Sequence, residues 1–535
     1  MLRCILILAL ANTAFTLNCQ SPKVNKREFR AVWVATIHNI DWPSKKGLSP
    51  EEQRQEFITL IDQHQQMGMN AIIVQIRASG DAFYQSAYEP WSEWLTGKQG
   101  QAPLPFYDPL EFMIEEAHKR GMEFHAWINP FRGVSHTRFS SVTDKHISRQ
   151  RPDWFFQHKN TIYFNPGIPQ VRNYLTRVVS DIVSCYDVDG IHFDDYFYPY
   201  RKLGETIADW DTYRVYGQAY DHISDWRRAN IDQFIHQVSD SIRAIKPLVK
   251  FGISPIGIWR NKQDDSSGSN TTSFSSYDMA YADVRKWLEK GWLDYVAPQL
   301  YWSTSHPGAN YTELLNWWSE NSFGRHVYIG HAMFKVKKNI AKRWHNPGEL
   351  PRQIEMRRHS ANVQGGIFYS ASSFKGNPHE IEELLQNNFH RHTALIPTMP
   401  WKDDIPPLAP WSAEISYHSD KPILTWRAPI PAADEQEAAQ YIVYGFPPGH
   451  EVDIRYPAFI RSIQPDTTFI DPEGMQAQGY HYAITAMDRL KNESKTFALV
   501  PAHPIKTIAI EQFATPPILH KGKNIKSRMG LEMLK

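Results

Sequence analysis

Eight short apolar runs alternate with longer amphipathic stretches between residues 29 and 388, and this alternation constrains the fold more than any other feature of the sequence. Runs that are apolar on both faces are typical of parallel strands, because such strands are buried on both sides. Stretches of helical periodicity between them are typical of βα units. The predicted strands cover residues 29–36, 70–77, 123–129, 190–194, 249–255, 295–301, 327–331 and 365–370.

Eight such units in succession predict an α/β fold, a closed (β/α)8 TIM barrel over residues 27–390. An open doubly wound sheet is the alternative. The count of eight strands over about 360 residues favours the barrel. Local signals agree with this assignment: Ser49 and Pro50 are typical of a helix start, and Gly121 is typical of a helix end.

The chain beyond the barrel has a different pattern. Five prolines between residues 397 and 410 predict a stiff linker over 391–410. Short strand-like runs separated by turn signals then predict a small all-β sandwich over 411–510. The run from Tyr480 to Asp488 resembles the penultimate strand of a fibronectin type III domain. Residues 511–535 are basic and lack a pattern, which predicts a tail.

The first 19 residues predict an export signal, because Arg3 precedes an apolar stretch that is too short to span a bilayer comfortably. Cys19 follows this stretch, as the lipidated cysteine of a lipoprotein does, although Asn18 replaces the usual small residue. Ordinary cleavage nearby is the alternative. We therefore expect an exported protein of the cell envelope, held at the membrane by a lipid if Cys19 is lipidated.

Charge and cysteine usage exclude several classes of function. The formal net charge is +1 and no run of Lys or Arg is present, so a nucleic-acid partner is not expected. Of the three cysteines, only Cys185 lies beyond the leader, which excludes an intrachain disulfide in the mature protein. No CxxC or HExxH motif occurs, so we expect no metal and no cofactor. The aromatic content of 13% fits either large cores or a sugar-binding cleft.

The end of the fourth predicted strand carries two adjacent carboxylates, Asp194 and Asp195. In barrel enzymes the reacting groups lie at the carboxyl ends of strands. Side chains alternate along a strand, so His192 and Asp194 should share one face while Asp195 points the other way. We therefore place Asp194 at the barrel mouth. A helix cap or an ion pair is the alternative for Asp194, and for Asp195 the structural interpretation is as strong as the catalytic one.

Glycoside hydrolysis needs a second carboxyl group, and strands five to eight end without one. The loop after the second strand offers Asp81, Glu89 and Glu93. Glu89 lies among apolar residues, and an apolar setting raises the pKa of a carboxyl group, as a general acid requires. Glu89 is therefore the first candidate for the acid and Asp81 the second, with solvated loop carboxylates as the alternative.

Other polar and aromatic groups near the strand ends could bind sugar hydroxyls or stack on sugar rings. His125 and His192 could instead form a metal pair, but two histidines without a fixed spacing do not define a metal site. The candidate substrate-binding residues are Arg77, His125, Trp127, Asn129, Arg132, His192, Tyr196, Gln299, Tyr301 and Trp302.

Four segments, at residues 29–34, 89–92, 125–132 and 190–199, together resemble the glycosyl-hydrolase-like 10 family of bacterial envelope proteins. The resemblance covers about residues 27–390. It implies a TIM barrel, an envelope location and hydrolysis of a glycan. Some members cleave peptidoglycan strands stripped of their peptides, and a relationship to α-galactosidase-like barrels supports a catalytic role for Asp194.

Three hypotheses remain open from the sequence. The first is a peptidoglycan-directed glycosidase with Asp194 as nucleophile or base and Glu89 as acid. The second is a non-catalytic glycan-binding envelope lipoprotein, and the third is a glycosidase acting on a dietary or host polysaccharide.

Overall fold

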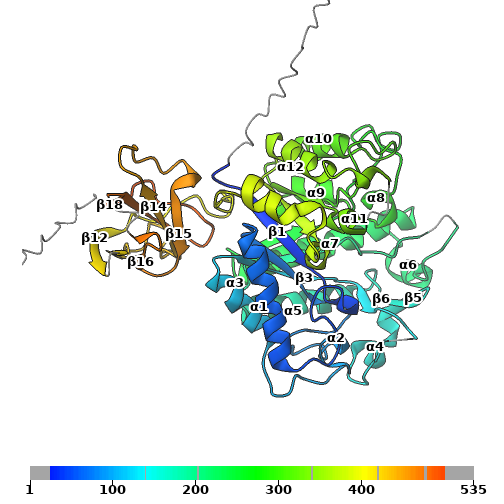
Figure 1. Ribbon diagram of the computed structural model, residues 1–535. Coiled ribbons are helices and arrows are strands. Elements are labelled where there is room, and N and C mark those ends of the chain that lie inside the picture. The colour runs from blue at the N-terminus through cyan, green and yellow to red at the C-terminus, as the bar shows by residue number, and fades with distance from the viewer. Residues whose placement is uncertain are drawn as a thin grey trace, which may run out of the picture.

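The computed structural model describes residues 25–138, 140–201, 204–338, 342–418, 421–474 and 479–500. These residues form a barrel domain and a separate β domain (Figure 1). The predicted export signal at 1–19, the predicted lipidation residue Cys19, residues 501–510 of the predicted sandwich and the predicted tail at 511–535 lie outside the described residues. No helix in the described part of the chain is long and apolar enough to cross a bilayer.

Eight parallel strands close into a barrel in the spatial order β1-β11-β10-β9-β8-β7-β3-β2. Closure confirms the predicted (β/α)8 barrel and rules out the open sheet, because an open sheet would leave two unpaired edges. The barrel strands are β1 (Phe29–Val34), β2 (Ala71–Arg77), β3 (Glu123–Ile128), β7 (Gly190–Phe193), β8 (Lys250–Ile253), β9 (Tyr295–Val296), β10 (His326–His331) and β11 (Gly365–Tyr369).

Helices follow the strands and form the outer layer of the barrel (Figure 1). The first of them, α1, begins as predicted, with Pro50 in its first turn. The Ser49 hydroxyl accepts a hydrogen bond from the Glu52 backbone N–H, and the Glu52 carboxylate accepts one from the Ser49 backbone N–H. The longer helices are α1 (Pro50–Gln66), α3 (Pro109–Lys119), α5 (Pro169–Cys185), α7 (Ile223–Ile245), α10 (Tyr311–Glu320) and α12 (Glu349–His359). The shorter ones include α9 (Val284–Glu289) and α13 (Ile381–Leu384).

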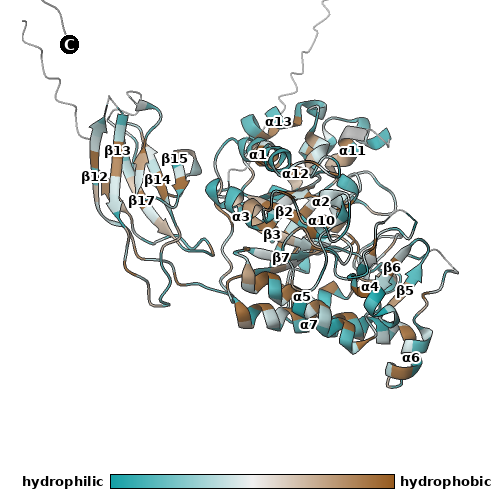
Figure 2. Cartoon of the chain, turned by 90° about the horizontal axis from the view of Figure 1, so that it is seen from below, coloured by the Kyte–Doolittle hydropathy of each residue, from teal (hydrophilic) through white to brown (hydrophobic). Residues whose placement is uncertain are grey.

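Long excursions leave the barrel after β3 and β7. The first contains a small antiparallel sheet of β4 (Arg132–Val134), β5 (Phe155–His158) and β6 (Thr161–Phe164), in the order β4-β6-β5. This sheet confirms the hairpin predicted around Thr161–Phe164. The second contains α6 (Trp210–Tyr216), which projects from the barrel near β5 and β6 (Figure 2). The first excursion also contains the short helix α4 (Ile147–Gln150), and other short helices follow β2, β8 and β10: α2 (Glu93–Thr96), α8 (Ser276–Met279) and α11 (Met333–Lys338).

A chain of hydrogen bonds between polar side chains runs through the barrel interior. Lys250 forms an ion pair with Glu123 at 2.6 Å, and Glu123 lies 3.2 Å from His125 Nε2. The Tyr295 hydroxyl then lies 2.8 Å from His125 Nδ1 and 2.9 Å from His192 Nδ1. These groups satisfy one another, as buried polar groups must. The chain therefore runs from the strand starts at Glu123 and Lys250 towards the carboxyl end of β7.

The second domain consists of two antiparallel sheets that share one apolar core. One sheet has the order β12-β13-β16 and the other β15-β14-β17-β18. Trp426, Tyr441 and Ile484 pack together between the sheets, which confirms the predicted small all-β domain. The finer resemblance to fibronectin type III stays a prediction. The strands are β12 (Trp411–His418), β13 (Lys421–Arg427), β14 (Gln440–Phe446), β15 (Ile460–Gln464), β16 (Thr468–Ile470), β17 (His481–Met487) and β18 (Ala498–Val500).

The segment between the domains is anchored to the barrel. Trp401 donates its indole N–H to the Asp294 carboxylate at 2.9 Å, and Lys402 pairs with the same carboxylate at 3.0 Å. The β domain adds an ion pair of its own between Arg489 and Asp187, at 2.6 Å. The proline-rich segment therefore holds the two domains together rather than only separating them.

Candidate active site

Asp194 lies at the carboxyl end of the barrel, directly after β7, and its side chain is buried. The Trp127 indole N–H and the Asn129 amide both donate to Asp194 Oδ2, each at 3.1 Å. The Tyr196 backbone N–H lies 3.3 Å from Oδ1. These contacts place the Asp194 side chain at the carboxyl end of the barrel, since Trp127 and Asn129 come from the carboxyl end of the neighbouring strand β3.

The environment of Asp194 favours the protonated carboxyl group. Its pKa is raised from 3.8 to about 7, mainly by burial, with the adjacent Asp195 carboxylate acting in the same direction. The Arg132 guanidinium and the Trp127 hydrogen bond act in the opposite direction. Near neutral pH the group is therefore poised to donate a proton, as a general acid requires.

Asp195 also faces the mouth, which corrects the prediction that it points away from Asp194. Its carboxylate accepts hydrogen bonds from the Tyr200 hydroxyl and from the Gln299 side chain. Strand β7 ends at Phe193, so the alternation of side chains no longer applies at residue 195. Burial raises the pKa of Asp195 above its usual value of 3.8. The two adjacent carboxyl groups thus form one acidic pair at the mouth.

Arg132 and Tyr196 line the mouth beside the carboxyl pair. The Arg132 guanidinium lies over the Tyr196 ring, 4.7 Å from its centre, and the Arg132 backbone N–H donates to Asn129 Oδ1 at 2.9 Å. This second contact orients the Asn129 amide so that its NH₂ group faces Asp194. Asp195 and burial both raise the pKa of Tyr196, so its hydroxyl stays protonated at neutral pH.

Aromatic residues form another part of the wall: Tyr369 ends β11, and Tyr301 lies in the segment that follows β9. Tyr301 and Tyr369 lie with their ring centres 6.1 Å apart, and Asp195 contributes to the raised pKa of both hydroxyls. Gln299 is held by a hydrogen bond of 2.9 Å to the Ser254 carbonyl. Trp302 is partly buried, and its backbone carbonyl accepts a hydrogen bond from Gln353 at 3.1 Å. Gln299 and Tyr301 thus lie near Asp195, and their roles in substrate binding stay predictions.

Tyr200 and Tyr369 are site residues that sequence reasoning missed. Tyr200 lies in the loop after β7, and Tyr369 is the last residue of β11. The rule that reacting groups lie at strand ends would have included Tyr369. No pattern in the sequence points to the contact between Tyr200 and Asp195.

Glu89 does not have the environment that was predicted for it. Both of its oxygens bind the Arg77 guanidinium, at 2.6 Å each, and both side chains are fully buried. Arg77 also donates to the backbone carbonyls of Asn129 and Pro130. Glu89 therefore lies in a buried bidentate ion pair and not in the predicted apolar setting, and this contact gives no support to its predicted role as the general acid. Arg77 is likewise a structural partner here and not a group open to substrate.

Asp81 is a buried carboxyl group within the loop after β2. Its Oδ2 accepts a hydrogen bond from Gln99 at 3.3 Å, and Oδ1 has no hydrogen-bond partner in the described structure. Burial raises its pKa to about 7. The contacts of Asp81 are with its own loop, and none of those described joins it to Asp194. The structure therefore does not bring this second candidate to the carboxyl pair.

His125 and His192 lie inside the barrel, and neither side chain is exposed at the mouth. Besides Tyr295, His192 contacts the Trp33 indole N–H at 3.2 Å and the Ser254 hydroxyl at 3.0 Å through Nε2. The prediction that these histidines bind substrate is corrected, because both side chains are fully buried. His192, two positions before Asp194, lies about 7 Å deeper along the strand. Burial holds the pKa of His192 well below its usual value, so the ring stays neutral.

A metal pair of histidines receives no support. His125 and His192 share the Tyr295 hydroxyl between them. Among the described residues, no group of three or more His, Cys, Asp or Glu side chains is placed to hold a metal ion.

Comparisons with known proteins place the chain among glycosyl hydrolase-like proteins. Residues 28–346 match the family model described as Glycosyl hydrolase-like 10. The chain is 43% identical over 486 residues to "Glycosyl hydrolase YngK" of Bacillus subtilis (strain 168), covering 90% of this chain and 94% of that protein. It is 38% identical over 368 residues to "Glycosyl hydrolase DigH" of Escherichia coli (strain K12), covering 64% of this chain and 83% of that protein.

Among solved structures, the glycoside hydrolase domain of PgaB (BpsB) from Bordetella bronchiseptica matches with a TM-score of 0.42 and 14% identity. That match covers 67% of this chain and 98% of that one. On the strength of the family model and of the two relatives, the chain belongs to the glycosyl hydrolase-like 10 family.

Proposed function

We propose that this protein is a glycoside hydrolase in which Asp194 and Asp195 act together at the barrel mouth. The observation that carries the proposal is the buried carboxyl pair itself. Burial raises the pKa of both groups, to about 7 for Asp194, at the end of the barrel where such enzymes place their reacting groups. Family membership supports the reaction class.

The two carboxyl groups would divide the acid and base roles. Adjacent like charges in a buried site do not both ionise easily, so the pair retains one proton near neutral pH. Asp194 donates this proton to the glycosidic oxygen as the bond from the anomeric carbon to that oxygen breaks. Ionised Asp195 stabilises the positive charge on the sugar and accepts a proton from the water that attacks the anomeric carbon.

The glycan strands of peptidoglycan are the substrate that we propose. Support comes from the resemblance of residues 89–92, 125–132 and 190–199 to envelope proteins that include enzymes of this specificity. The partly exposed rings of Tyr196, Tyr301 and Tyr369 offer apolar faces to pyranose rings at the mouth. A polysaccharide of dietary or host origin would meet the same rings, so the choice between substrates must be made by experiment.

The proposal is tested by incubating the soluble protein with peptide-free glycan strands, intact peptidoglycan and a panel of plant and host polysaccharides. Released reducing ends and product masses are then measured. We expect cleavage of peptide-free strands, and we expect Asp194→Asn and Asp195→Asn each to lower kcat by about 10²–10⁴-fold. Asp211→Asn is the matched control, because the Asp211 side chain is 98% exposed on α6. Wild-type rates for both mouth variants would refute the carboxyl pair.

A non-catalytic glycan-binding protein is the second candidate. This candidate is favoured by one observation: among the described residues, no other Asp or Glu side chain forms a hydrogen bond or ion pair with Asp194 or Asp195. The same incubation decides between the two functions. Binding of glycan strands without release of reducing ends would support the binding protein.

An envelope location is also part of the proposal, with a lipid on Cys19 as the anchor. It rests on the apolar stretch that precedes Cys19 in the sequence. Metabolic labelling with a fatty acid tests it: wild-type protein should carry the label and Cys19→Ser protein should not.

A further inference from the structure

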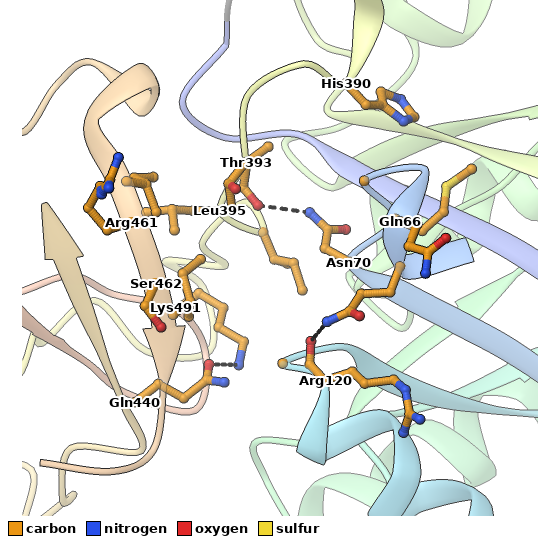
Figure 3. Close-up of a pocket in the computed structure, with 18 of the residues that line it drawn as sticks. Gln66, Asn70, Arg120, His390, Thr393, Leu395, Gln440, Arg461, Ser462 and Lys491 are labelled. Carbon is orange, nitrogen blue, oxygen red and sulfur yellow. Dashed lines mark hydrogen bonds between the residues drawn. The ribbon is translucent and has the colours of Figure 1, made fainter. Parts of the chain in front are cut away.

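A cavity of about 470 Å³ lies between the barrel and the β domain (Figure 3). Its barrel side consists of residues just before β2 and β3, including Asn70 and Arg120. Its other side comes from β14 and β15 and from Lys491, and residues 393–396 of the linker complete the wall. Parallel strands begin at the end of the barrel opposite to the one where they finish, so this cavity lies at the far end of the barrel from Asp194.

The charge of the cavity wall has one sign. None of the described residues that line it is an Asp or a Glu. Four positively charged side chains contribute to it: Arg120, Arg391, Arg461 and Lys491. Arg120 and Arg461 have carboxylate partners outside the cavity, at 2.6 Å and 2.9 Å respectively. Arg391 has no ion pair with any residue that the structure describes, which leaves its charge available at the cavity.

Lys491 is the unusual member of this wall. The residue is only 8% exposed, and its ammonium group donates a hydrogen bond to Gln440 Oε1 at 2.9 Å. An ammonium group has three donors, and no carboxylate of the described chain lies within ion-pair distance of it. Burial lowers the pKa of Lys491, while Glu123 and Asp189 act on it from a greater distance. A buried cation without a carboxylate partner is costly unless an anion completes the site.

The remaining lining offers amides and aliphatic side chains. The Gln66 and Gln386 side chains make no hydrogen bond within the described structure, so their amides are available to hydroxyl groups. Leu395, Ile460 and Ile463 add apolar surface. No Phe, Tyr or Trp lines the cavity, so it has no ring on which a neutral sugar could stack. A volume of about 470 Å³ is in the usual range for small-molecule sites.

We propose that this cavity is a binding site for an acidic sugar unit, whose carboxylate pairs with Lys491 and Arg391 and whose hydroxyl groups bind the glutamine amides. This inference goes beyond the proposed hydrolysis and uses none of the residues at the mouth. A site at this end of the barrel would hold a glycan independently of cleavage, and both domains would have to be in place to form it.

The test is calorimetric titration of the full chain with three ligands in turn. N-acetylmuramic acid is the acidic sugar, N-acetylglucosamine is its neutral counterpart that lacks only the acidic side group, and inorganic phosphate is an anion without a sugar. We expect the acidic sugar to bind and the neutral sugar to bind at least about tenfold more weakly, because one charge-assisted pair is worth at least that factor. Phosphate keeps the charge but has no sugar ring to reach the glutamine amides and the apolar lining, so it should also bind more weakly than the acidic sugar. Equal binding of the neutral sugar, or tighter binding of phosphate, would overturn the proposal.

Variants locate the binding site. Lys491→Met should weaken binding of the acidic sugar by about tenfold or more, whereas the exposed Lys290→Met should leave it unchanged. If Lys491→Met does not fold, as judged by thermal unfolding, Gln66→Ala and Gln386→Ala give the same test without loss of a buried contact. Wild-type affinity in these variants would overturn the site. Cleavage of glycan strands should stay at the wild-type rate throughout, so failure of this proposal is distinguishable from failure of the proposed function.

Discussion

Trp127 donates its indole N–H to the Asp194 carboxylate at 3.1 Å, across the boundary between the adjacent barrel strands β3 and β7. Asn129 donates to the same carboxylate oxygen. The other carboxylate oxygen, Oδ1, points towards the Tyr196 backbone N–H, which lies 3.3 Å away. The orientation and the proton affinity of Asp194 therefore depend on a residue 67 positions away in the sequence.

Replacing Trp127 by Phe should therefore shift the titration of Asp194. The indole hydrogen bond stabilises the ionised carboxylate and lowers its pKa, so its loss raises the pKa. We expect the alkaline limb of the pH profile of kcat/KM to move to higher pH. We expect kcat at the optimum to fall by about tenfold, since orientation is partly lost. A fall in kcat with an unmoved limb would assign Trp127 only a packing role.

The pH dependence of the wild-type enzyme follows from the carboxyl pair. Asp194 must be protonated to act as the acid, so kcat/KM should fall by about tenfold per pH unit above a pKa of about 7. Asp195 must be ionised, and burial raises its pKa above 3.8, so the acidic limb should lie above that value. Initial rates on peptide-free glycan strands between pH 4 and 9 would show both limbs. An alkaline limb that persists in Asp195→Asn, moved to lower pH because the Asp195 charge no longer raises the pKa of Asp194, but is absent in Asp194→Asn assigns the limb to Asp194.

Stability should also report the raised pKa of Asp194. The folded pKa of about 7 lies above the unfolded value near 3.8, so the folded state binds more protons between these two pH values. The free energy of unfolding of the wild type therefore loses this contribution as pH rises from 3.8 to 7 and stays low above pH 7. Asp194→Asn lacks this loss, so relative to wild type its free energy of unfolding should gain roughly 4 kcal/mol between pH 4 and pH 8.

Denaturant unfolding of both proteins at these two pH values measures the difference. Asp211→Asn, at an exposed position, should show no such dependence. A constant difference between Asp194→Asn and wild type across the pH range would contradict the raised pKa.

Glu89→Gln should act on stability and not on chemistry. The change leaves the buried Arg77 guanidinium without a counter-charge, which typically costs about 3–5 kcal/mol. We expect a lower thermal midpoint, with kcat per folded molecule within about threefold of wild type. The double variant Arg77→Met with Glu89→Met should be less destabilised than Glu89→Gln, since no buried charge remains. A loss of kcat with unchanged stability would return Glu89 to the catalytic candidates.

The order of structural elements was predictable because it is encoded locally. Apolar runs of strand length alternate with helical periodicity, and only a closed barrel buries eight such strands on both faces. The position of Asp194 followed from the same pattern, because the residue that directly follows a barrel strand lies at the carboxyl end of the barrel. Gln299 and Tyr301 were found by the same rule.

The partners of these groups were decided only by tertiary structure. Glu89 has apolar neighbours in the sequence, but the fold places Arg77 against it, 12 positions away along the chain. Asp195 turned towards the mouth because β7 stops at Phe193, a boundary that depends on pairing with β3 and β8. The sequence by itself thus determined which strands exist and in which order, whereas the ends of β7 and β9, at Phe193 and Val296, were decided by strand pairing in the folded barrel. Which charges meet was decided by the closed barrel, since a carboxylate's pKa and role depend on atoms that only folding brings within hydrogen-bond distance.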